Sequence, residues 1–209
     1  MKAGWITIAL GATLAAAPLA GGQAQAQTVA QAPRHTEADV RFVQMMIGHH
    51  QQALEMAALV PDRSQREDLR RLAERIDVSQ RDEMATMRQW LREHGAPAPD
   101  AHAGHGGAHA SHGAAADSSH AGMPGMATPE QMAALAAASG AAFDRMFLEL
   151  MIHHHEGALV MVAELFASPG GGQESSIFAL ANEVDADQRM EIDRMQALLD
   201  GPLSRTAPR

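Results

Sequence analysis

Two segments of the chain are nearly the same: "FVQMMIGHHQQALEMA" spans Phe42 to Ala57, and "FLELMIHHHEGALVMV" spans Phe147 to Val162. Eight of the first fifteen positions are identical, and each segment has adjacent histidines at its centre. Apolar residues recur with the period of a helix instead of alternating as they do in a strand. We therefore expect two equivalent helices, each with a histidine pair in its middle.

A second pair of similar segments follows the first. "LAERIDVSQRDEMATM" from Leu72 aligns with "LANEVDADQRMEIDRM" from Leu180, and both carry glutamine, glutamate and methionine at the same spacing. Two helical hairpins that are each apolar on one face can bury that face by packing together. The sequence thus predicts an all-α protein, a four-helix bundle made of two duplicated hairpins.

The first hairpin is expected to cover residues 36–94. Its first helix begins at Thr36, and Pro61 is expected to end it because proline lacks the backbone N–H that continues a helix. In the turn that follows, Ser64 and Glu67 form a capping-box pattern, which predicts the start of the second helix.

The second hairpin is expected to cover residues 128–200. "TPEQ" offers an N-cap, a first-turn proline and a capping-box glutamine, so we expect the third helix to start at Thr128 and to run to about Ala167. The fourth helix is expected from about Ser175 to Leu199, where glycine and proline follow.

Residues 1–26 have the pattern of a signal peptide. Lys2 precedes an apolar run, and "AQA" at residues 24–26 is a small-residue cleavage site. An uncleaved membrane anchor is the alternative, although the run is short for a membrane span. We expect an exported protein, periplasmic or secreted, that does not associate with the membrane after cleavage.

Residues 95–127 are rich in Gly, Ala, His, Ser and Pro and show no periodicity, which predicts a disordered linker between the hairpins. This tract also holds donors that suit metal capture in a segment with no core to fill. A purification tag or random drift is the alternative origin. The candidate ligands in the linker are His102, His105, His109, His112, His120, Met123 and Met126.

Composition narrows the class of protein. The chain has no cysteine, which excludes disulfides and thiolate metal sites, but it has 14 methionines and 12 histidines. Its net charge of −9 argues against binding to nucleic acid or anionic lipid, because both attract basic surfaces. In an oxidising compartment, thioether and imidazole are the soft and borderline metal ligands that remain.

The helical period places both members of each histidine pair toward the bundle interior. His49 and His50 fall on the two shoulders of a line through Met46, and His154 and His155 are placed in the same way. Four inward imidazoles are costly to bury without partners. They belong either to a buried polar network or to metal sites; the inward polar residues of the other two helices are Gln80, Glu83, Gln188 and Glu191.

Ligand softness decides which metal fits. Methionine with histidine and no cysteine favours Cu(I), with silver as its mimic, while the linker histidines suit Cu(II). Zinc and nickel gain nothing from thioethers. A di-iron centre in a four-helix bundle needs Glu-x-x-His on two helices, and no inward pair here has that spacing.

"MIGHHQQALEMA" and "MIHHHEGALVMV", each followed by a helix with Gln-x-x-Glu and a later methionine, closely resemble an exported bacterial family of unknown function, family three hundred and five. The resemblance implies a ferritin-like four-helix fold and periplasmic copper binding. Carried over by position, it implies that the ligands are among Met46, His49, His50, Met56, Met151, His154, His155 and Met161. Gly48 and His153 stand where the family usually has proline, and the role of His153 is left open.

These observations lead to a functional prediction. We expect a copper-binding protein that sequesters Cu(I) and Cu(II) or passes them to another periplasmic copper-handling protein, and so contributes to copper and silver tolerance. We expect no catalytic residues, with Glu83 and Glu191 orienting imidazoles. The alternatives are a ferritin-like metal-dependent redox enzyme and a structural or interaction bundle in which the histidines only satisfy one another.

Overall fold

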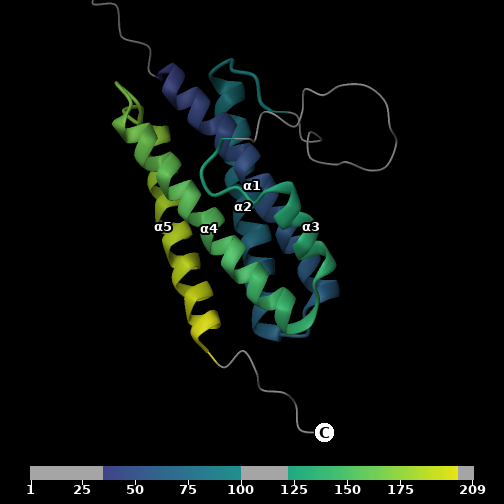
Figure 1. Cartoon of the computed structure of the whole chain (residues 1–209). Helices are drawn as coiled ribbons and strands as arrows, with labels where there is room; N and C mark the ends of the chain where they lie inside the picture. The colour runs from purple at the N-terminus through teal and green to yellow at the C-terminus, as the bar shows by residue number, and fades with distance from the viewer. Residues whose placement is uncertain (1–34, 100–121, 202–209) are drawn as a thin grey trace, which may run out of the picture. The chain divides into compact units, whose positions relative to one another are not determined.

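The computed structural model describes residues 35–99 and 122–201, and within these ranges the chain is entirely helical, which confirms the all-α prediction (Figure 1). The helices are α1 (Glu37–Arg63), α2 (Glu67–Glu93), α3 (Pro129–Ala137), α4 (Gly140–Ala167) and α5 (Ser175–Asp200). None of the described helices combines the length and the apolar character needed to cross a bilayer.

The four long helices form a bundle of two hairpins. α1 packs against α2, α4 packs against α5, and the hairpins meet mainly through α1 and α4, while α2 and α5 touch only sparsely. The core divides into two apolar clusters. The first core cluster includes Phe42, Met46, Met84, Met87 and Met161. The second core cluster includes Met56, Phe143, Phe147, Met151 and Met195. Because each cluster joins the start of one histidine helix to the end of the other, α1 and α4 run antiparallel.

Two of the predicted helix starts are confirmed in detail. Thr36 caps α1 by accepting a hydrogen bond from the backbone N–H of Asp39, whose side chain in turn accepts from the backbone of Thr36. Thr128 and Gln131 form the same reciprocal arrangement at the start of α3. Each box satisfies backbone donors that the first turn leaves free.

The prediction for the start of α2 is wrong. Ser64 is the C-cap of α1, and its hydroxyl accepts from the backbone N–H of Arg66, which is the N-cap of α2 and contributes no side-chain cap. The Glu67 side chain instead pairs with Arg71 one turn further on. The Ser-x-x-Glu pattern therefore begins two residues too early to cap this helix.

Pro61 does not end the first helix, contrary to the prediction, because α1 continues to Arg63. Proline removes one backbone hydrogen bond, but the terminal turn has other partners here. The Arg70 guanidinium donates to the carbonyl oxygens of Pro61 and Ser64, each at 3.0 Å. Carbonyls that a helix end leaves free are thus satisfied by a side chain of the next helix.

The single helix predicted from Thr128 to Ala167 is also wrong, since the chain breaks it into α3 and α4 at Ala138 and Ser139. Both residues are extended, and Gly140 follows with φ +58°, a left-handed conformation that glycine adopts without a steric penalty. The Ser-Gly dipeptide is a turn signal that the run of alanines around it obscures.

Both described flanks of the predicted linker are packed, which corrects that prediction at its ends. Residues 122–127, called the strap below, cross α1 and α4: the Gln52 amide makes two hydrogen bonds with the backbone of Ala127, at 2.7 and 2.9 Å. Met123 is 7% exposed, and Met126 packs on the first core cluster. These two methionines therefore do fill a core. The signal-peptide prediction and the linker histidines His102, His105, His109, His112 and His120 lie outside the described residues.

The strap can approach α4 this closely only because Gly125 of the strap meets Gly157 of α4. A Cβ on Gly125 would come within 2.7 Å of the Gly157 Cα, and a Cβ on Gly157 would come within 2.1 Å of the Pro124 carbonyl oxygen. Gly125 also has φ +76°. Backbone therefore rests directly on backbone above the middle of the bundle, next to the histidines.

Candidate metal centre

The four predicted histidines meet in the middle of the bundle. His49, His50, His154 and His155 are all fully buried. The rings of His49 and His154 face each other across the α1–α4 interface with their centroids 3.8 Å apart. Along both helices the histidines occupy the turn between the two core clusters, so an apolar layer closes the site at each end.

Each imidazole makes one strong contact through Nε2. His50 donates to Glu83 at 2.5 Å, and His155 donates to Glu191 at 2.6 Å. His49 donates to the Pro124 carbonyl of the strap, and His154 donates to the backbone carbonyl of His49, each at 2.9 Å. Carboxylates and carbonyls accept hydrogen bonds, so the proton of each ring lies on Nε2.

That arrangement leaves a lone pair on Nδ1 of every ring. All four Nδ1 atoms are buried and have no hydrogen-bond partner in the described part of the protein. The side-chain amides of Gln80 and Gln188 are also buried without a partner, on both oxygen and nitrogen. An unsatisfied buried polar atom costs on the order of 1–3 kcal/mol. The cluster of such atoms in one interior marks this region as the candidate ligand-binding centre.

The electrostatics keep the central pair neutral. Burial, reinforced by the neighbouring His50, lowers the pKa of His49 to about 3. Burial, reinforced by His49 across the interface, lowers the pKa of His154 well below its usual value. Both rings are therefore uncharged in any ordinary medium, which is the protonation state that binds a metal ion.

These lowered pKa values predict that the metal-free protein loses stability in acid. Below the unfolded-state pKa of about 6.5, the unfolded chain takes up protons that the folded His49 and His154 refuse, so the free energy of unfolding falls with pH, by up to about 1.4 kcal/mol per pH unit for each ring. Urea titrations at several pH values between 7.5 and 4.5 measure this slope. A variant with glutamine at both positions should show a shallower slope, and equal slopes would contradict the assignment.

The predicted methionine ligands flank the histidines in two groups. Met46 and Met161 are buried in the first core cluster, and Met56 and Met151 are buried in the second. The eight predicted residues thus form a layer of imidazoles between two pairs of thioethers. Within residues 35–99 and 122–201, no three His, Asp or Glu side chains form a group that could hold a metal ion without methionine sulfur.

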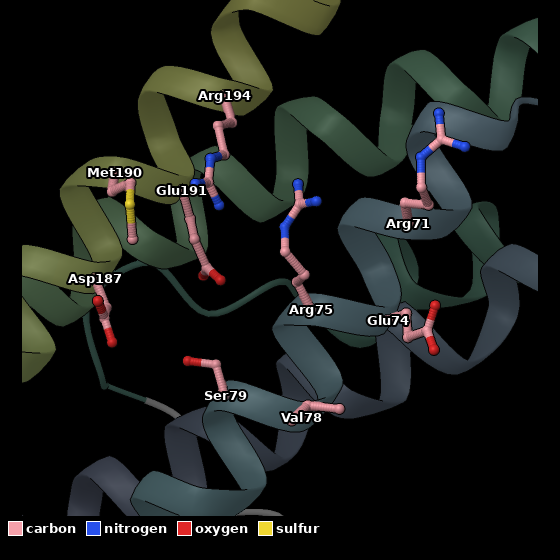
Figure 2. A pocket seen from close by; sticks show the side chains of 9 residues that line it. All are labelled: Arg71, Glu74, Arg75, Val78, Ser79, Asp187, Met190, Glu191 and Arg194. Carbon is pink, nitrogen blue, oxygen red and sulfur yellow. The ribbon is translucent and has the colours of Figure 1, made fainter.

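A groove of about 510 Å³ opens between α2 and α5, the helix pair with sparse contact (Figure 2). Arg75 on the α2 wall and Arg194 on the α5 wall line it, together with Glu191, the partner of His155. Burial, together with the carboxylates of Glu83 and Glu191, raises the pKa of Asp187, which also lines the groove. The groove therefore brings solvent close to the carboxylate side of the centre.

Sequence comparison places this architecture in a family. The family described as domain of unknown function 305 (DUF305) matches residues 39–199, which cover the four bundle helices except for two residues of α1 and one of α5. The chain belongs to this family. No curated protein matched the chain.

Solved DUF305 structures share the fold. A DUF305 fragment from Deinococcus radiodurans is 35% identical, with a TM-score of 0.64 over 80% of this chain and 98% of that one. A DUF305 protein from Streptomyces coelicolor, described as secreted, is 32% identical, with a TM-score of 0.61 over 78% of this chain and 90% of that one. CopM in its Cu(I)-bound form is 25% identical, with a TM-score of 0.56 over 77% of this chain and 94% of that one. CopM has also been solved with Cu(II) and with silver.

Within this DUF305 fold, one feature of the centre could not be predicted from the motif, whereas the less inward direction expected for His153 is confirmed. The Pro124 carbonyl, which orients His49, comes from a tract without periodicity, and no sequence signal marks a backbone acceptor. His153, the extra histidine of the third predicted helix, is 62% exposed and lies 3.8 Å from Glu156, so it points away from the centre.

Proposed function

We propose that this DUF305 protein is an exported copper-binding protein whose bundle holds Cu(I) through the buried histidines and the methionines beside them. The observation that carries the proposal is the set of four Nδ1 lone pairs, all buried and all without a partner among residues 35–99 and 122–201. Each opposite ring nitrogen is held by an acceptor, the arrangement that orients imidazoles as metal ligands.

The donor set favours a soft ion. Neutral imidazole with thioether sulfur suits Cu(I) and its mimic silver, whereas zinc and magnesium would gain nothing from sulfur of this kind. Methionine does not have to lose a proton to bind, so these ligands need no charge inside an apolar interior. The carboxylates of Glu83 and Glu191, which accept hydrogen bonds from Nε2 of His50 and His155, would supply negative charge near a bound Cu(I) ion.

The relatives support the same reading. CopM shares the fold at 25–26% identity and has been solved with Cu(I) and with Cu(II), so copper in both states is the cargo that we propose here. The linker histidines would capture Cu(II) more loosely. The protein would then sequester copper in the periplasm or pass it to another copper-handling protein, and we propose no catalytic role for it.

The experiment that tests this function uses the full chain purified without an affinity tag. Metal-free protein is loaded with Cu(I), then challenged with increasing amounts of a chromophoric Cu(I) chelator. We expect at least one equivalent of copper to remain on the protein at chelator concentrations that strip histidine-rich peptides. Complete and immediate loss would favour the structural bundle, and copper-dependent consumption of oxygen or peroxide would favour the redox enzyme.

A further inference from the structure

A second pair of sulfur donors lines a cavity beside the histidine centre. Neither belongs to the eight residues predicted as bundle ligands, although Met123 is among the predicted linker ligands. A cavity of about 330 Å³ opens between α1 and the two described flanks of the linker. Met45 of α1 and Met123 of the strap both line it, together with Gln44, Gly48 and Pro97. Two thioethers from different segments therefore share one solvent-connected space.

This cavity adjoins the histidine centre through both of its methionines. Met45 precedes His49 by four residues on α1, so the two side chains are neighbours on one face of the helix. Met123 precedes Pro124, whose carbonyl accepts the hydrogen bond from His49. A metal ion held by these two sulfurs would thus stand next to His49.

A metal ion needs a route into the centre, because the predicted ligands there are shielded from solvent. The four histidines are fully buried, and so are Met46, Met56 and Met151. Met45, by contrast, is only partly buried, and it packs on the first core cluster that contains Met46 and Met161. Methionine side chains therefore lie next to one another from the partly exposed Met45 to the buried Met46 and Met161.

We propose that Met45 and Met123 form a loading site that takes up Cu(I) from solution and passes it to His49 by ligand exchange. This inference rests on the proposed function and adds the route by which the metal arrives. Sulfur ligands suit the task because they bind Cu(I) without losing a proton and release it readily to a neighbouring donor. No change of oxidation state is involved.

The first hairpin carries the methionine of the loading site, and the second hairpin does not. The position equivalent to Met45 on α4 is Leu150, which cannot bind metal, although the methionine, isoleucine and paired histidines that follow it are retained. The flanks of the histidine-rich tract also end at this cavity, since Pro99 lines it and Met123 follows His120 by three residues. Ions captured by that tract would be delivered beside the loading site.

The test measures both the rate at which Cu(I) is transferred to the protein and the amount of Cu(I) that the protein retains at equilibrium. Full-length protein and a variant with leucine at Met45 and Met123 are mixed in a stopped-flow instrument with the complex of Cu(I) and a chromophoric chelator. Leucine conserves the volume, so the core should persist, and a thermal melt checks that it does. We expect transfer to the variant to be about tenfold slower while the amount of Cu(I) retained at equilibrium changes little. Met190→Leu, which removes an exposed thioether on α5, is the control and should load at the original rate.

The outcomes separate this inference from the function on which it rests. If the double variant loads as fast as the original protein, the loading site is wrong although copper binding stands. If it loses equilibrium retention in proportion to the rate, the two methionines are final ligands and the inference is again wrong. A native chain that takes no Cu(I) from the chelator at all contradicts the proposed function itself.

Discussion

Alanine at His49, His50, His154 and His155 together is expected to abolish tight retention of Cu(I), with a loss of affinity of at least about 100-fold. The four side chains supply every buried imidazole in the described part of the chain, and each presents an Nδ1 lone pair to the interior. Without them, no buried imidazole remains in the described part of the chain. Competition with a chromophoric Cu(I) chelator measures the change.

The neighbouring His153 provides a matched control for that experiment. It belongs to the same run of three histidines but is 62% exposed and faces Glu156, so His153→Ala should leave the affinity unchanged. Four truncations to alanine open cavities in the core. Two double variants, one with asparagine at His49 and His154 and one with asparagine at His50 and His155, repeat the test with a smaller loss of side-chain volume. Unchanged retention in folded variants would place the copper elsewhere.

Glutamine at Glu83 and Glu191 is expected to weaken Cu(I) binding by about 10- to 100-fold, although neither carboxylate needs to touch the metal. Each accepts the Nε2 proton of one imidazole, at 2.5 Å from His50 and 2.6 Å from His155, and so fixes Nδ1 as the free donor. A neutral amide lowers the basicity of the ring and lets it reorient. The same competition assay reports the loss.

Two exposed glutamates on the same helices serve as the comparison. Glu74 of α2 and Glu183 of α5 are exposed to solvent, so a variant with glutamine at both positions removes the same charge without touching an imidazole. Its affinity should remain that of the native protein. Equal losses in the two double variants would mean that overall charge, and not the orientation of His50 and His155, is responsible.

Local periodicity was enough to predict the bundle and the convergence of its histidines. The inward direction of His49 and His154 follows from 3.6 residues per turn, and the second helices carry Gln80, Glu83, Gln188 and Glu191 at a register that the structure confirms as buried. These features depend on spacing within one helix, which the sequence expresses directly.

Contacts that depend on tertiary structure could not be predicted in that way. Pro61 lies inside α1, where Arg70 of the next helix donates to its carbonyl. Met123 is buried because two glycines far apart in the sequence allow the strap to approach α4. The composition of residues 95–127 indicated disorder throughout, yet the end of that segment supplies the acceptor for His49. Composition averages over a segment and cannot distinguish six packed residues at its end.

The central claim is that copper lies in the bundle interior, bound by imidazole nitrogen and thioether sulfur together. X-ray absorption at the copper edge, recorded on the full chain loaded with one equivalent of Cu(I), tests this claim most directly. We predict scattering from both nitrogen and sulfur in the first coordination sphere, with the outer-sphere pattern of imidazole, and loss of that pattern in the quadruple alanine variant. A spectrum with imidazole nitrogen but no sulfur, unchanged in that variant, would contradict the account.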